Sequence, residues 1–205
     1  MFGYIISLAK CREEDLIVTI LCEKRVEKLY RFYGARHSVI NLGFKVDFVK
    51  ELDSVNSMGK LRNILHINYK WCFDFKKLQI WQHFIQLTEK HLRGVNELDS
   101  FYFELLDETA HKLERQDPKR SIIESYTKLL EHEGRLHNDY HCFICEEIID
   151  KDLCLTRGFL PAHKTCVYKN SYDFKKIDDL FISKKSTLLD SNEIDSLWNI
   201  IMQGL

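Results

Sequence analysis

The stretch that decides the fold is Phe44–Val49, which reads FKVDFV. Its apolar residues stand at every second position and alternate with Lys45 and Asp47, a period that is typical of a strand with one buried face. Similar β-rich runs occupy residues 3–9, 16–22, 27–33 and 61–69. Five short strands within about 70 residues predict a small barrel or a sandwich.

The apolar pattern changes to a helical period after this region. Apolar stripes at residues 75–92 and 101–113 predict two helices. Asp117 followed by Pro118 predicts the start of a third helix, which ends near Gly134. Asp190, with Glu193 three residues later, predicts a capping box on a last helix. The chain is therefore expected to be an α+β protein, with a β domain at 1–72 and a mainly helical domain at 73–205.

The composition narrows the class of protein. The chain has 205 residues, of which 45% are hydrophobic, so it can bury a core. No apolar run approaches the roughly 18–20 residues that span a bilayer, and the first residues predict a strand and not a signal peptide. The 7 cysteines are then expected to be thiols or metal ligands in a reducing compartment.

Charge is unevenly distributed between the two halves of the chain. Residues 1–80 hold 14 Lys and Arg against 9 Asp and Glu, a net charge of +5. Residues 81–205 hold 16 against 22, a net charge of −6. A basic half joined to an acidic half indicates a polyanion-binding domain attached to a second module, although random variation of the surface would give the same numbers.

One segment has the spacing of a metal site. Cys142-Phe-Ile-Cys145 is followed, after seventeen residues, by His163-Lys-Thr-Cys166. Two such pairs can complete a tetrahedron around one Zn²⁺, which leaves no open position and so predicts a structural site within residues 140–169. The alternatives are that these are ordinary buried cysteines, or that Cys154 replaces His163 as a ligand. His141 is a weaker competitor.

The window Lys24–His37 reads KRVEKLYRFYGARH and combines cations with aromatic rings. Cations neutralise phosphates, and aromatic faces stack on unpaired bases, so the window is a candidate nucleic-acid surface. A solvated strand edge is the alternative. Because neighbouring side chains of a strand face opposite ways, we expect Phe32 or Tyr33 to lie in the core, whereas Tyr30 fits either role. No phosphate-binding glycine loop or nucleophile motif is present, which favours a protein that is not an enzyme.

Several short motifs resemble those of a known family. They are Gly3–Ser7 (GYIIS), Glu13–Val18 (EEDLIV), Tyr33–Ser38 (YGARHS) and Leu61–Ile64 (LRNI), with the paired metal ligands in the second half. In this order they resemble the RecO family of DNA repair and recombination mediators, in the shorter form of the Campylobacter and Helicobacter group. Cys22 stands where the family has Thr. Tyr33 stands where the family has Lys, and His37 where Arg is common, so the loop at these two residues is less basic than in the family.

The resemblance implies a fold and a set of partners. It implies an OB-fold of five strands at the N-terminus, a helical C-terminal domain and a structural Zn²⁺. It also implies a non-enzymatic mediator of the RecF pathway that binds single- and double-stranded DNA and anneals complementary strands. The implied partners are RecR and the C-terminal tail of single-stranded DNA-binding protein, in the bacterial cytoplasm at the nucleoid and not at a membrane.

On this reading the DNA-binding side chains are expected at the barrel. The main candidates are Lys24, Arg25, Lys28, Tyr30, Arg31 and Arg36, with Arg12, Lys45, Lys60 and Arg62 as additions. A transcriptional regulator that reads DNA through the zinc segment is disfavoured, because Cys145–Asp152 (CEEIIDKD) is acidic and would repel phosphates. A zinc-containing scaffold for protein interactions, without nucleic acid, is the other alternative.

Overall fold

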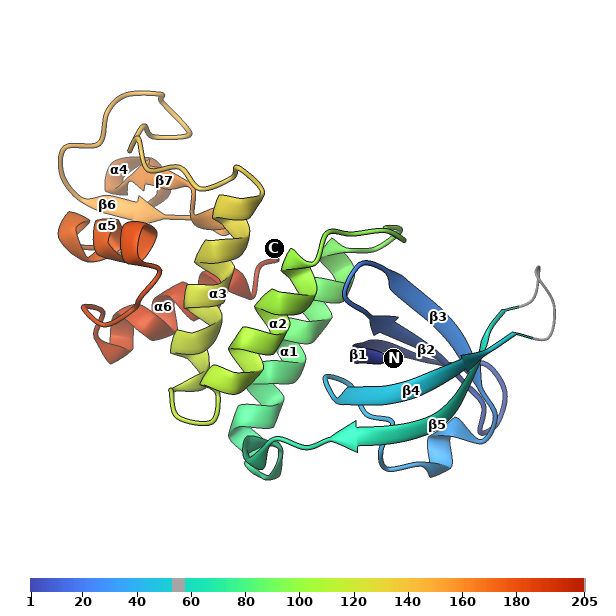
Figure 1. The fold of residues 1–205 in the computed structure, drawn as a ribbon. Helices are drawn as coiled ribbons and strands as arrows, with labels where there is room; N and C mark the ends of the chain where they lie inside the picture. The colour runs from blue at the N-terminus through green and yellow to red at the C-terminus, as the bar shows by residue number, and fades with distance from the viewer. Residues whose placement is uncertain (53–57, 205) are drawn as a thin grey trace. The chain divides into compact units, whose positions relative to one another are not determined.

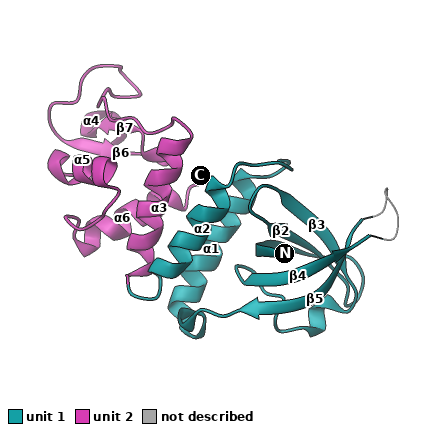
Figure 2. Ribbon diagram, in the orientation of Figure 1, with its two compact units in different colours: residues 1–115 teal, residues 116–205 magenta. Residues whose placement is uncertain are grey.

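The computed structural model describes residues 1–52 and 58–204 and divides the chain into two compact units (Figures 1 and 2). Residues 1–115 form the first unit and residues 116–205 the second. The first unit holds a barrel and two helices, while the second holds helices and a two-stranded hairpin. None of the helices in the described ranges is both long and apolar enough to cross a lipid bilayer.

Five strands of the first unit close into a barrel in the order β1-β2-β3-β5-β4. Their bounds are β1 Phe2–Lys10, β2 Leu16–Leu21, β3 Val26–Arg31, β4 Lys45–Glu51 and β5 Lys60–Ile67. Antiparallel pairing joins β1 to β4, and a parallel contact between Tyr30 of β3 and Lys60 of β5 closes the circle. Closure selects the barrel over the sandwich, and the five-stranded barrel is the expected OB-fold.

The alternation that predicted the strands also fills the barrel. Val46 and Phe48 are buried in its core, and Phe44 packs against them from the edge. The neighbouring strands add Val18, Ile20, Leu29 and Leu61. Side chains fill an interior this narrow, so a ligand of this barrel must lie on its outer surface.

Helices α1 (Phe75–His91) and α2 (Phe101–Lys112) pack against β1 within the first unit. The indole N–H of Trp81 donates a hydrogen bond to the carbonyl of Gly43 at 2.8 Å. Gly43 has a φ of +82°, and a Cβ atom there would lie 2.6 Å from the Trp81 ring nitrogen. Because both helices pack on the barrel, the compact unit extends to Arg115, beyond the strand-to-helix change at residue 72 where we expected the domain to end.

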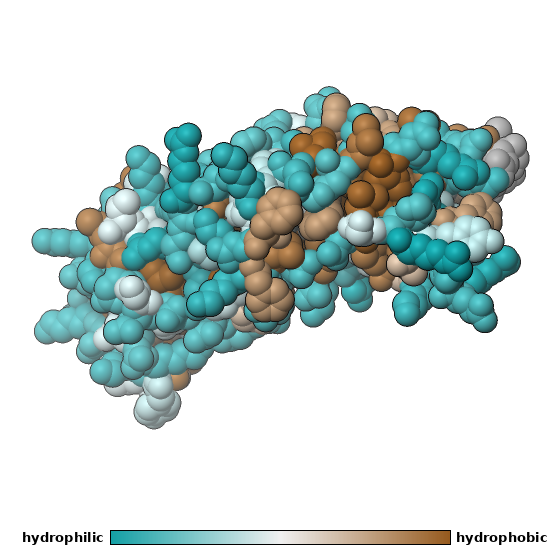
Figure 3. Space-filling view, turned by 90° about the horizontal axis from the view of Figure 1, so that it is seen from below, coloured by the Kyte–Doolittle hydropathy of each residue, from teal (hydrophilic) through white to brown (hydrophobic). Residues whose placement is uncertain are grey.

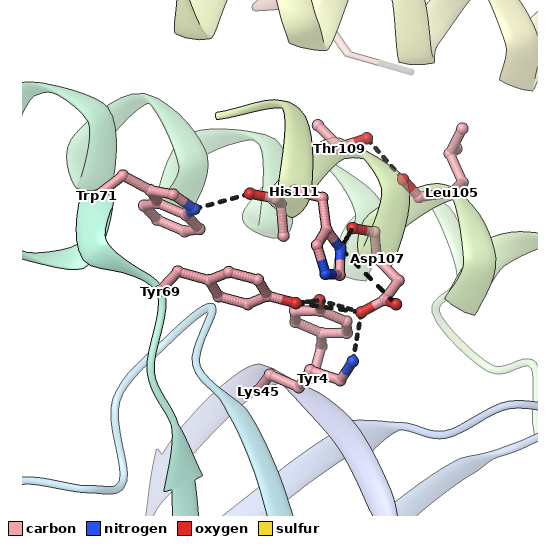
Figure 4. Close-up of polar contacts among 9 residues, drawn as sticks. Tyr4, Lys45, Tyr69, Trp71, Leu105, Asp107, Thr109 and His111 are labelled. Carbon is pink, nitrogen blue, oxygen red and sulfur yellow. Dashed lines mark hydrogen bonds and ion pairs between the residues drawn. The ribbon is translucent and has the colours of Figure 1, made fainter. Parts of the chain in front are cut away.

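A polar cluster around Asp107 joins α2 to the barrel (Figure 4). Tyr4 and Tyr69 donate hydrogen bonds to the Asp107 carboxylate at 2.8 and 3.2 Å. Lys45 of β4 forms an ion pair with the same carboxylate. Burial alone would raise the pKa of Asp107, but the bonds from Lys45 and Tyr4 outweigh it and lower this pKa. The cluster therefore fixes the ionised form of Asp107 between helix and barrel.

The second unit combines helices with a short hairpin (Figure 1). Its elements are α3 Pro118–His132, β6 Leu153–Leu155, β7 Pro161–His163, α4 Lys164–Val167, α5 Phe174–Ser183 and α6 Ser191–Ile201. Asp117 caps α3, and Asp190 forms the predicted capping box of α6 with Glu193. The helix α5 and the hairpin were not expected from the sequence, although Asp173 caps α5.

Candidate functional site

Two of the motifs that carry the family resemblance meet at one end of the barrel. The Asp15 carboxylate, at the start of β2, accepts hydrogen bonds from the Tyr30 hydroxyl and from the Tyr33 backbone amide. These two bonds lower the pKa of Asp15. Arg36 pairs with Glu14 at 2.5 Å on the other side of the same turn. The turn that follows β3 is therefore anchored to the chain that precedes β2.

The aromatic rings of this turn are exposed. Phe32 is 40% exposed and Tyr33 is 58% exposed, so the expectation that one of them lies in the core was wrong. The reason is the turn itself: Tyr33 adopts a left-handed φ of 51°, which ends the strand alternation before its ring can reach the core. Arg36 lies 5.2 Å from the centre of the Tyr33 ring, and Lys60 lies 5.8 Å from that of Phe32. Each exposed ring thus has a cation beside it.

The exposed cations of the predicted set differ in how strongly they are held. Three are exposed and make no ion pair within the described ranges: Arg12, Lys24 and Lys28. Three more are paired: exposed Arg25 with Glu27, exposed Arg36 with Glu14, and half-buried Arg62 with Glu51. The pairs of Arg36 and Arg62 are largely open to solvent, and pairs of this kind contribute about 0–1 kcal/mol, so a phosphate can replace their carboxylates.

Two of the predicted cations are poorly placed to meet a ligand. Lys45 has only 14% of its side chain exposed and is paired with Asp107. Arg31 donates to the Leu61 carbonyl at 2.9 Å, and burial lowers the pKa of its guanidinium. Both residues are half-buried, and both bond to partners that are distant in sequence. Neither is included in the DNA surface proposed below.

The four predicted metal ligands come together in the second unit. The ligand atoms of Cys142, Cys145, His163 and Cys166 all lie within 4.8 Å of one another. The first two residues stand on a turn before β6, His163 ends β7, and Cys166 lies on α4. The hairpin thereby carries the second pair back to the first.

The distances within this cluster fit one tetrahedral ion. Sulfur ligands about 2.3 Å from Zn²⁺ would be separated by about 3.8 Å in a tetrahedron. The sulfur atoms of Cys145 and Cys166 are 4.0 Å apart, and Cys145 Sγ is 3.3 Å from His163 Nδ1. The set of three thiols and one imidazole can therefore bind one metal ion.

Backbone amides prepare one of the thiols for a metal. Burial would raise the pKa of Cys142, but hydrogen bonds from backbone N–H groups, that of Cys145 first, lower it to about 6. One of these bonds runs from the His163 amide to Cys142 Sγ at 3.5 Å. The thiolate is the form that binds metal ions, so the fold favours the ligand form of this cysteine before any ion arrives.

The competitors for the fourth ligand position lie outside the cluster. Cys154 is fully buried on β6, and its sulfur lies 3.4 Å from the carbonyl of Lys169. His141 has its Nδ1 3.4 Å from the carboxylate of Asp139. In the described ranges His163, and not Cys154, completes the group.

The second unit also contains a pocket that the sequence did not reveal. It has a volume of about 450 Å³ and is lined by Arg135, His137, Phe143, Thr156, Arg157, Gly158, Leu160 and Gln203. The pocket thus combines two guanidinium groups with apolar side chains. Only the fold brings residues near 137, 157 and 203 together, so no local signal marks it.

A comparison with protein families finds a match at the barrel. Residues 1–72, about a third of the chain, match the family model described as RecO N terminal. These residues contain the closed barrel and the motifs joined through Asp15. No curated protein matches the chain.

Proposed function

We propose, from the match of residues 1–72 to the RecO N-terminal family model, that the chain is a RecO-type DNA repair protein that binds single- and double-stranded DNA on the outside of its barrel. On this proposal it is a non-enzymatic recombination mediator in the cytoplasm, at the nucleoid. It would anneal complementary strands and, with RecR, help to exchange single-stranded DNA-binding protein for recombinase in the RecF pathway.

The observation that carries the proposal is the pair of exposed aromatic rings beside cations. Exposed Phe32 and Tyr33 offer faces on which unpaired bases can stack. Arg36 and Lys60, beside those rings, are placed for the phosphates of the same strand. Exposed Lys28, further along β3, extends this surface along the barrel.

Annealing follows from the physics of such a surface. Two complementary strands repel each other through their phosphates, and a cationic surface that binds both lowers this repulsion. If about five cations contact phosphates, the logarithm of the affinity for a single strand should fall against the logarithm of salt with a slope of roughly −3.5. The net charge of −1 for the whole chain limits non-specific attraction, so local contacts must supply the affinity.

The test replaces two exposed lysines of the barrel. We expect Lys24→Glu with Lys28→Glu to weaken single-strand binding at least tenfold and to make the salt slope shallower by roughly 1.4. The measurement is a fluorescence anisotropy titration of a labelled oligonucleotide across a salt series. Both side chains are exposed, so the thermal unfolding temperature should not change.

A matched control lies on the second unit. Lys175 and Lys185 are exposed and make no ion pair within the described ranges, so Lys175→Glu with Lys185→Glu makes the same change of charge elsewhere. If the control variant and the barrel variant lose affinity equally, long-range attraction and not a barrel surface governs binding. If the wild-type chain binds no DNA at low salt, the proposed function is wrong.

The pocket of the second unit is our candidate for the tail of single-stranded DNA-binding protein. A C-terminal tail ends in a carboxylate, which Arg135 or Arg157 can bind, while Phe143 and Leu160 offer apolar contact. We expect a labelled tail peptide to bind wild type at least tenfold more tightly than Arg157→Ala. A peptide with an amidated C-terminus should bind both proteins equally weakly. Equal binding of the acid and the amide by wild type would exclude this pocket.

We propose that the metal of the four-ligand cluster is zinc and that its role is structural. Thiolate and imidazole ligands favour Zn²⁺, and four protein ligands leave no position for a reacting water. The segment that holds them contains two strands of only three residues each, so the ion would supply stability that packing does not.

A further inference from the structure

A second pair of exposed aromatic rings lies outside the surface described so far. Phe73 is 82% exposed and Phe75 is 77% exposed. They flank Asp74, between the 3₁₀ helix η2 (Lys70–Phe73) and α1. This end of α1 lies at the lower edge of Figure 1, and hydrophobic side chains gather among hydrophilic ones on the face seen from below in Figure 3. We call Phe73 and Phe75 the second aromatic pair.

The backbone that carries this pair is held firmly in place. Trp71 is 4% exposed and donates its indole N–H to the Ala110 carbonyl at 2.7 Å (Figure 4). Its ring stacks on that of Tyr69 with centres 5.6 Å apart. Asp74 caps α1 by accepting hydrogen bonds from the first backbone amides of the helix. Since Trp71 occupies the inward position of this short helix, Phe73 is directed to solvent on a rigid support.

Two lysines stand close to the second aromatic pair in the sequence. Lys70 and Lys76 are exposed, and neither ammonium group makes an ion pair within the described ranges. The nearby carboxylates are already engaged, because Asp74 accepts from helix amides and Glu114 accepts from the Lys70 amide at 2.8 Å. Apolar rings beside free cations are complementary to a ligand that carries both flat faces and negative charge.

We infer that the second aromatic pair is a stacking site for unpaired bases of single-stranded DNA, with Lys70 and Lys76 as phosphate contacts. The inference rests on the proposed function and deepens it, because it assigns single strands a site that double strands do not share. In a duplex the bases stack on one another and offer no free face to a phenyl ring. An apolar protein segment would also cover two rings, but it would leave both lysines without a partner.

The test compares single and double strands on one variant. We expect Phe73→Ala with Phe75→Ala to weaken binding of an oligothymidine at least tenfold and binding of a duplex of the same length less than twofold. The salt slope should not change, because no phosphate contact is lost. The control is Leu65→Ala, which removes another strongly exposed apolar side chain, 67% exposed on β5, and should leave both affinities unchanged.

A reporter variant tests the site directly. Trp71, Trp81 and Trp198 are all buried, so DNA should not quench their fluorescence. Phe73→Trp adds one exposed indole whose fluorescence a stacked base can quench. We expect single strands to quench this added fluorescence and duplex to leave it unchanged. The Phe73→Trp variant should bind single strands with the affinity of wild type.

Three results would overturn the inference while leaving the proposed function standing. In the first, wild type and the double alanine variant bind single strands equally. In the second, saturating single strand does not quench the fluorescence of Phe73→Trp. In the third, the alanine variant fails to bind a protein partner but keeps its affinity for single strands. If wild type bound neither kind of DNA, the proposed function itself would fail.

Discussion

The Asp15 carboxylate accepts a hydrogen bond from the backbone amide of Tyr33 at 2.8 Å, although the two residues are 18 positions apart. The same carboxylate accepts from the Tyr30 hydroxyl on β3. One side chain therefore holds the end of β3 and the turn beyond it, which carries the exposed rings and Arg36. Together with the pair of Arg36 and Glu14, this carboxylate holds the turn that carries the proposed DNA surface.

Replacement of Asp15 by Ala should loosen that turn. We expect Asp15→Ala to lower the thermal unfolding temperature by a few degrees and to weaken single-strand binding several-fold, because the ring of Tyr33 loses its fixed position. Unfolding followed by circular dichroism and an anisotropy titration measure the two effects. Glu13→Ala is the control, since Glu13 is exposed and adjacent. A variant that kept full affinity would show that the turn does not need its anchor.

The pH dependence of the same variant follows from the lowered pKa of Asp15. A carboxylate whose folded pKa lies below its unfolded value stabilises the fold above the unfolded pKa, near 3.9, and loses this contribution as pH falls through the folded pKa. The difference in unfolding temperature between wild type and Asp15→Ala should therefore be constant from about pH 5 to 7 and shrink below about pH 4. A difference that grew on acidification would contradict this assignment.

The ion pair of Lys45 with Asp107 gives a prediction about stability and not about DNA. The Lys45 side chain is only 14% exposed, and Asp107→Ala leaves its ammonium group without a partner. The same substitution removes the acceptor of two tyrosine hydroxyls. We expect a loss of about 1–3 kcal/mol in the free energy of unfolding, measured in urea. Glu108→Ala, on the solvent side of the same helix, should cost less than about 0.5 kcal/mol. Lys45→Gln should leave single-strand affinity unchanged.

Gly43 and Gly94 form a matched pair of glycines. Both have a left-handed φ, +82° and +87°, but a Cβ atom at Gly43 would lie 2.6 Å from the Trp81 ring, whereas one at Gly94 has open space. We expect Gly94→Ala to cost about 1 kcal/mol from backbone strain alone, and Gly43→Ala about 2–4 kcal/mol because α1 must also move. Equal costs would mean that the Trp81 contact does not hold α1 on the barrel.

Local sequence patterns predicted most of the secondary-structure elements of the fold. The alternation in Phe44–Val49 depends only on which residues face the core, and the capping box at Asp190 depends on residues three positions apart. Such signals survive without knowledge of the rest of the chain. The order of strands does not, because the contact of Tyr30 with Lys60 that closes the barrel joins segments thirty residues apart.

The candidate sites show the same division. The spacing of Cys142 and Cys145, and of His163 and Cys166, is local, and the fold brings these residues together. Whether a single cation is exposed or paired is not a local property, because Lys45 forms its ion pair with Asp107, sixty-two residues later in the chain. The helix α5 could have been found from Asp173 and its apolar stripe, whereas the hairpin beside the metal ligands has strands too short for a period to be visible.

Loss of one metal ligand should unfold part of the second unit and leave the barrel intact. We expect wild type to contain one equivalent of zinc and Cys142→Ser to contain less than a tenth of that, by elemental analysis of the purified protein. Because the ion would hold two segments of the chain together, the variant should lose protection from hydrogen exchange in residues 140–169. Single-strand affinity should stay within twofold of wild type, since the proposed DNA surface lies in the first unit.

Two other cysteines serve as controls for this experiment. Cys11 is exposed and Cys154 is buried outside the ligand group, so Cys11→Ser should change nothing, and Cys154→Ser should lower stability while keeping one equivalent of zinc. If Cys154→Ser released the metal and His163→Ala did not, Cys154 and not His163 would be the fourth ligand. If wild type held no metal and Cys142→Ser folded normally, the four residues would be ordinary thiols and an imidazole, and packing alone would order the segment.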